Sequence, residues 1–153
     1  MRRVLFVAAL SLSSVITGSA QTPAPSSSGI NACALLTKED AAAALGEAVT
    51  GQPRSTSMAE AASCEYSGSG IHSVNLNVMA LSAANAGMYK AMCAKKSKDG
   101  LTGLGDVTCW YNDKHAELQV LKGLTFFSIE LRRSGDPTEP IKAVARKVYE
   151  RVK

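Results

Sequence analysis

Four cysteines constrain the fold of this chain more than any other feature. They are Cys33, Cys64, Cys93 and Cys109. An even number of cysteines, with neither a C-x-x-C motif nor closely spaced His and Cys ligands, is typical of a disulfide framework and not of a redox or zinc site. Three connectivities are possible. We favour Cys33 with Cys64 and Cys93 with Cys109, because each of these pairings ties a helix, or its leading edge, to the strand that follows. The sequence therefore predicts two disulfides, no metal and no cofactor.

The first 20 residues have the pattern of a signal peptide. Arg2 and Arg3 precede an apolar stretch over residues 4–16, and small residues follow at 18–20, as a signal peptidase requires. We expect cleavage near Ala20, which would place the mature chain in a secreted or periplasmic and oxidising compartment. No other segment approaches the roughly 18 apolar residues of a membrane span. The sequence therefore predicts no transmembrane segment in the mature chain.

After the leader, the chain divides into a short linker and one domain. Residues 21–29 read QTPAPSSSG, a composition typical of a flexible spacer. Residues 30–153 have the length of a single domain. Without Arg2 and Arg3 there are 15 basic residues against 13 acidic ones, so the net charge falls from +4 to +2. This balance gives no reason to expect a nucleic-acid partner.

Capping residues and helical spacing predict three helices. Thr37 caps a short helix that Gly46 ends. Ser82 caps a second helix to about Lys96, and the last helix opens near residues 136–139. The second helix is expected to bury one stripe, with its methionines as core filler; the stripe consists of Ala84, Met88, Ala91, Met92 and Lys95. The last helix has its apolar residues at Ile141, Val144, Ala145, Val148 and Val152.

Alternation of apolar and polar residues predicts five strands, over residues 63–66, 73–80, 107–111, 116–120 and 124–132. The fold class is therefore α+β, with an antiparallel sheet packed on helices. The sheet's second face is expected to be wet, and carries Asn75, Asn77, Glu117, Gln119 and Ser128. The segment from Cys64 to Val78 resembles the segment from Cys109 to Val120, so we also expect two pseudo-duplicated halves, each a helix followed by a hairpin.

Several segments resemble a bacterial domain family of unknown function, which occurs as secreted proteins and lipoproteins of actinobacterial-type envelopes. The resemblance lies in Cys33-Ala34-Leu35-Leu36-Thr37, in Ser63-Cys64-Glu65-Tyr66, and in Gly103-Leu104-Gly105-Asp106 ahead of Trp110-Tyr111. It covers nearly all of the chain from Cys33 onward. It implies a secreted α+β envelope accessory or binding module and transfers no catalytic residue. Many members are anchored through a lipid-modified cysteine at the processing site, where this chain has Gln21.

The sequence favours a non-enzymatic binding module for an unknown protein or envelope ligand. The candidate binding residues are Asn75, Asn77, Trp110, Tyr111, His115, Glu117 and Gln119, because an aromatic among amides is typical of a recognition surface. One alternative is a small hydrolase that uses His115 with Asp113 or Glu117. A second is a structural or inhibitor-like protein whose loop over residues 97–105 enters another protein's cleft.

Overall fold

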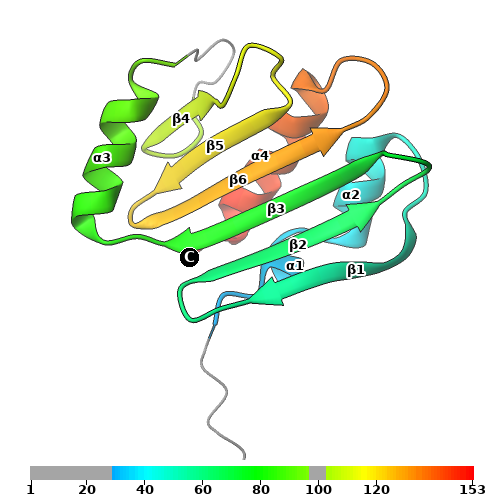
Figure 1. The fold of residues 1–153 in the computed structure, drawn as a ribbon, viewed down its shortest axis with the longest axis horizontal. Helices are drawn as coiled ribbons and strands as arrows, with labels where there is room; N and C mark the ends of the chain where they lie inside the picture. Colours follow the sequence, from blue (N-terminus) through cyan, green and yellow to red (C-terminus); the bar gives the residue numbers. More distant parts are fainter. Residues whose placement is uncertain (1–28, 97–102) are drawn as a thin grey trace, which may run out of the picture.

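The computed structural model describes residues 29–96 and 103–153. The predicted signal peptide, most of the predicted linker, and six residues of the loop over 97–105 lie outside this range. The described strands form one six-stranded antiparallel sheet in the order β1-β2-β3-β6-β5-β4 (Figure 1). The elements in chain order are α1 (Ala32–Leu35), α2 (Lys38–Leu45), β1 (Thr50–Ser57), β2 (Ala61–Ser67), β3 (Ser73–Ala80), α3 (Ala83–Cys93), β4 (Val107–Trp110), β5 (Glu117–Lys122), β6 (Thr125–Arg132) and α4 (Thr138–Arg151). The predicted α+β class with an antiparallel sheet is confirmed.

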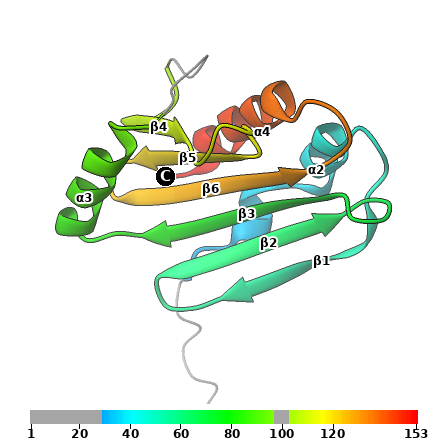
Figure 2. The same cartoon turned by 45° about the horizontal axis from the view of Figure 1, so that its top comes forward.

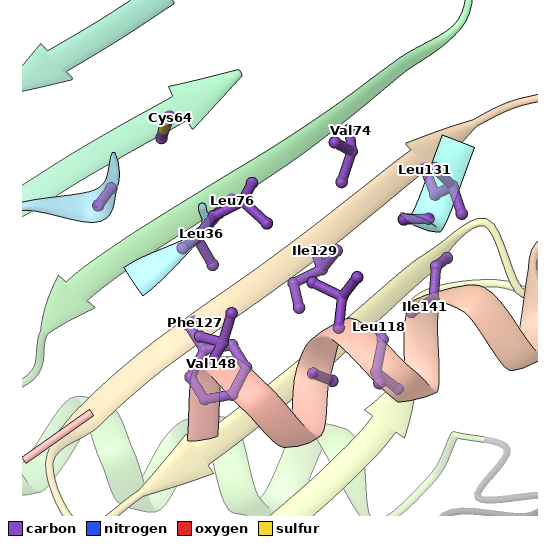
Figure 3. Close-up of a cluster of buried hydrophobic side chains, with 14 of the residues drawn as sticks. Leu36, Cys64, Val74, Leu76, Leu118, Phe127, Ile129, Leu131, Ile141 and Val148 are labelled. Carbon is purple, nitrogen blue, oxygen red and sulfur yellow. The ribbon is translucent and has the colours of Figure 1, made fainter. Parts of the chain in front are cut away.

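The main core lies between one face of the sheet and the helices α1, α2 and α4 (Figures 1 and 2). Alternation along the strands places Val74, Leu76 and Val78 of β3 in this core, as predicted. β6 contributes every second residue in the same way. Figure 3 shows Ile141 and Val148 of α4 among these strand residues. Because α4 also carries a clear apolar stripe, it buries the face that its spacing predicts.

The remaining helix, α3, packs on the opposite face of the sheet, over β4, β5 and β6. The prediction that this whole face is wet is wrong at that end, because Gln119, which lies beside α3, and Ser128 are both buried. The predicted stripe of α3 is also wrong. The helix buries Ala86, Tyr89 and Cys93 and leaves Met88 exposed. The disulfide at Cys93 orients the helix, so its methionines do not reach the core.

Both predicted disulfides are confirmed in their pairing. Cys33 is bonded to Cys64 and joins α1 to β2 on the main core face. Cys93 is bonded to Cys109 and joins α3 to β4 on the other face. Each face of the sheet is therefore linked covalently to a helix.

The predicted helix caps are present. The Thr37 hydroxyl accepts a hydrogen bond from the Asp40 amide at 3.2 Å, and the Asp40 carboxylate accepts one from the Thr37 amide at 3.4 Å. Gly46 ends α2 in the left-handed conformation, with φ of 73°, which glycine adopts without strain. Ser82 caps α3 through the Asn85 amide at 3.2 Å. This helix ends at Cys93, three residues before the predicted end.

Two further features depart from the sequence predictions. β1 is a strand that was not predicted, and it pairs with β2 at the edge of the sheet. The pseudo-duplicated halves are not confirmed, because β2 is an inner strand whereas β4, its supposed counterpart, is the other edge strand. The helices that precede the two hairpins also lie on opposite faces.

Candidate ligand groove beside α3

The candidate binding residues are not brought together on one surface. Asn75 and Asn77 are half-buried on β3. Trp110 is part of the main core and is 1% exposed, so it contributes nothing to the polar face. Tyr111 is exposed, with the Lys96 ammonium 4.4 Å from the centre of its ring. The predicted surface is therefore divided between the core, the sheet and a loop.

His115 is held by packing and not by a carboxylate. Its ring stacks on Trp110 with 4.5 Å between ring centres, and its Nδ1 lies 3.4 Å from the Thr138 hydroxyl. Its backbone has a left-handed φ of 52°, which few residues adopt. Within the described part of the chain, neither Asp113 nor Glu117 hydrogen-bonds to it. The geometry gives no support to a catalytic pair at His115.

Basic residues of α4 have internal partners. The Lys147 ammonium lies 2.8 Å from the buried Asp40 carboxylate, and Arg151 pairs with the same carboxylate. Arg151 also donates to the Leu35 carbonyl at 2.7 Å. These charges hold α4 against α1 and α2, so they are not all available to an acidic partner.

An apolar groove of about 370 Å³ lies between α3 and the sheet. Its walls are α3 and parts of β3, β5 and β6, and we call it the α3 groove. Its lining residues are Met79, Leu81, Asn85, Met88, Tyr89, Met92, Gln119 and Phe126. The rings of Tyr89 and Phe126 meet edge to face, with centres 4.8 Å apart. Met88 and Met92 follow each other by one helical turn and are both exposed.

The groove forms because α3 contacts the sheet through only one stripe. The disulfide at Cys93 holds its C-terminal end, and Tyr89 and Ala86 fill the space beneath it. Met88 and Met92 lie on a neighbouring stripe, so they overhang the sheet instead of packing on it. The i, i+4 methionines are visible in the sequence, but only the orientation of α3 shows that they face a groove.

Gln119, which lines this groove, carries an unsatisfied acceptor. Its Nε2 donates to the Glu117 carboxylate at 3.1 Å, and this bond fixes which end of the amide is the oxygen. The Oε1 atom is buried and has no hydrogen-bond partner. A buried acceptor without a donor costs on the order of 1–3 kcal/mol. Gln119 is thus the one predicted binding residue that lines the groove.

The polar groups of the groove are suited to binding and not to proton transfer. Burial, and to a smaller extent the charge of Glu117, raises the pKa of the Tyr89 phenol well above its usual value of 10. The phenol therefore stays neutral, and its oxygen lies 3.7 Å from the Cys109 sulfur. No three His, Cys, Asp or Glu side chains of residues 29–96 and 103–153 gather as a metal site requires.

No helix in the described part of the chain is long and apolar enough to cross a membrane. Comparison with protein-family models, with curated proteins and with solved structures finds no match to this chain. The resemblance to the envelope family therefore stays a prediction.

Proposed function

We propose that this chain is an exported binding module that holds a small amphipathic molecule of the cell envelope in the α3 groove. The observation that carries the proposal is the buried, unpartnered carbonyl oxygen of Gln119 among apolar groove residues. The two disulfides support it, because they brace a small domain in an oxidising compartment. The groove itself carries no catalytic group, so the proposal for this site is binding.

The chemistry of the groove indicates one class of occupant. Its volume of about 370 Å³ is within the range of small-molecule sites, and methionine side chains adapt to ligands of irregular shape. The apolar walls suit a hydrocarbon chain. The Gln119 oxygen suits a hydroxyl or amide N–H at one end of that chain. Because this oxygen is buried, the side chains around it must shift when a donor enters.

A matched pair of probes tests the need for a donor. We expect 1-octanol to bind the mature, oxidised protein about fivefold more tightly than its isomer methyl heptyl ether, since a hydrogen bond contributes about 1 kcal/mol. Isothermal titration calorimetry measures both affinities. In Gln119→Leu, which keeps the volume but removes the acceptor, the two probes should bind equally. If Gln119→Leu still bound the alcohol more tightly than the ether, the assigned role of Gln119 would be refuted.

A second pair of variants tests the location. Met88 and Met58 are both 69% exposed, but only Met88 lines the groove, since Met58 follows β1. Met88→Asp places a carboxylate beside the hydrocarbon chain and should weaken octanol binding at least about tenfold, or 1.4 kcal/mol. Met58→Asp should leave it unchanged. Equal losses in both variants, or the absence of octanol binding to the native protein, would end the small-molecule proposal.

A further inference from the structure

Three loops meet at the end of the sheet where β3 begins and β6 ends (Figure 1). The loop after α2 carries Glu47, the β2–β3 hairpin carries Ser69 and His72, and the loop between β6 and α4 carries Ser134. The His72 Nδ1 lies 2.9 Å from a Glu47 carboxylate oxygen. The His72 Nε2 lies 3.1 Å from the Ser134 hydroxyl. One imidazole therefore joins a carboxylate to a hydroxyl.

Glu47, the carboxylate of this hydrogen-bonded series, is held in place by Ser69 as well as by His72. Glu47 accepts a hydrogen bond from the Ser69 amide at 2.8 Å and another from the Ser69 hydroxyl at 2.7 Å. Gly68 makes room for it, since a Cβ at that residue would lie 2.2 Å from the Glu47 oxygen. Only glycine at residue 68 is compatible with this position of the carboxylate.

The hydroxyl end is held as well. Arg133 donates to the Ala44 carbonyl at the end of α2 at 2.7 Å, and to the Ser134 carbonyl at 3.1 Å. The next residue, Gly135, has a φ of 82° and so turns the chain sharply after Ser134. The loop that carries the hydroxyl is therefore tied to the helix that precedes Glu47.

The hydrogen-bond roles follow from the charge on Glu47. The Ser69 hydroxyl and amide, together with His72, lower the pKa of the Glu47 carboxyl to about 2, so at neutral pH it is ionised and only accepts. The His72 Nδ1 must then donate to it. In a neutral imidazole the Nε2 is left as the acceptor, and the Ser134 hydroxyl donates to it. This is the relation of nucleophile, base and orienting acid in serine hydrolases.

We infer that Ser134, His72 and Glu47 form an acyl-transfer site for small esters, separate from the α3 groove and independent of its proposed ligand. The Ser134 oxygen attacks the ester carbonyl carbon, and its proton passes to His72 Nε2. The bond to the alkoxy oxygen breaks, and the alcohol leaves with that proton. Water then attacks the acyl-serine and gives its proton to His72, which returns it to Ser134. The balance is ester plus water to acid plus alcohol.

The surroundings leave the site open to small esters. Ser134 is exposed and His72 is about a quarter exposed, at 24% of its side chain, so the ester is reached directly from solvent. The backbone N–H of Gly135 donates to no residue in the described part of the chain and directly follows the nucleophile, where acyl-transfer enzymes place an oxyanion donor. Ile71, which is 87% exposed and precedes His72, offers an apolar contact beside the site.

The test uses p-nitrophenyl acetate with the mature, oxidised protein. Ser134→Ala and His72→Gln should each lower kcat/KM about hundredfold, and the double variant no further, because the two residues act as one unit. Glu47→Gln should lower kcat about tenfold with KM unchanged, as expected of a positioning residue. A simple imidazole-catalysed background would instead depend on His72 and persist in Ser134→Ala, and that result would overturn the inference.

Three controls keep the outcome clear. Ser57→Ala removes another exposed serine, and His115→Asn removes the other histidine while suiting its left-handed backbone; both should keep full activity. A fluorophosphonate probe should form a covalent adduct on Ser134, detected by mass spectrometry, and should form none in His72→Gln. Native-like circular dichroism of each variant shows that folding is intact. No adduct on Ser134 in the native protein would refute the site, whatever the groove binds.

Discussion

Asp40→Asn is expected to lower the free energy of unfolding by about 2 kcal/mol at pH 7. Asp40 is buried at 3% exposure in the first turn of α2. Its carboxylate accepts hydrogen bonds from Lys147 at 2.8 Å, from the Thr37 hydroxyl at 3.0 Å, and from Arg151. It therefore links the start of α2 to the last two turns of α4. An amide at this position keeps one acceptor but also presents a donor to two cations.

The magnitude follows from the pKa of this carboxyl. Burial raises the pKa, but the hydrogen bonds from Arg151, Lys147 and Thr37 outweigh burial and lower it from 3.8 to about 2. A difference of this size corresponds to about 2 kcal/mol of stability for the ionised, folded form. Because the folded pKa is the lower one, this stability is complete above about pH 4 and is lost as the pH falls toward 2.

Urea unfolding of the oxidised protein, followed by circular dichroism, provides the measurement. From pH 7 to pH 5 the free energy of unfolding of the native protein should exceed that of Asp40→Asn by about 2 kcal/mol. This difference should disappear between pH 4 and pH 2. Glu139→Gln is the matched control, since Glu139 also pairs with a lysine but is 75% exposed, and it should cost less than about 0.5 kcal/mol. A gap that is absent at pH 7, or constant down to pH 2, would refute the account of Asp40.

Two further predictions concern the covalent and backbone constraints of the fold. Replacing both Cys93 and Cys109 with Ala opens a loop of 16 residues and should lower the unfolding free energy by about 3 kcal/mol, measured in urea; an unchanged midpoint would contradict this. At Gly105, which has a φ of +74°, an alanine Cβ would lie 2.7 Å from the Leu121 carbonyl oxygen. Gly105→Ala should therefore lower the free energy of unfolding by roughly 3 kcal/mol. Gly123→Ala, with a φ of +60° and open space around it, should cost only about 1 kcal/mol, and equal melting temperatures for the two variants would show that the contact is unimportant.

Local rules predicted most elements of this fold. The caps at Thr37 and Ser82 are side-chain to backbone hydrogen bonds within four residues, so they can be recognised from neighbouring letters. The alternation of Val74, Leu76 and Val78 is equally local. β1 was missed because it is an edge strand, exposed along nearly all of its length. It needs no apolar residues, and its glycine and proline argue against a strand when read alone.

The faces of the helices and the sites were less accessible to prediction. α3 has apolar residues on several sides, so its spacing does not decide between Met88 and Tyr89 as the buried residue. The bond from Cys93 to Cys109 decides it. The resulting orientation of α3 covers Gln119, exposes the methionines and creates the groove. Likewise, the sequence favoured His115, which has carboxylates nearby in the chain, and only the loop contacts give His72 its carboxylate and hydroxyl partners.

The sequence by itself determined the α+β class, the caps and the strand faces of the main core, because each depends on residues close together in the chain or on the simple period of a strand. It also favoured the observed disulfide pairing among three possible ones. The tertiary structure alone decided which stripe of α3 is buried, where the acceptor of Gln119 is left without a donor, and which histidine meets a serine 62 residues away. The physical reason is that these contacts join segments distant in sequence, so they are set by packing and loop geometry and not by local propensity.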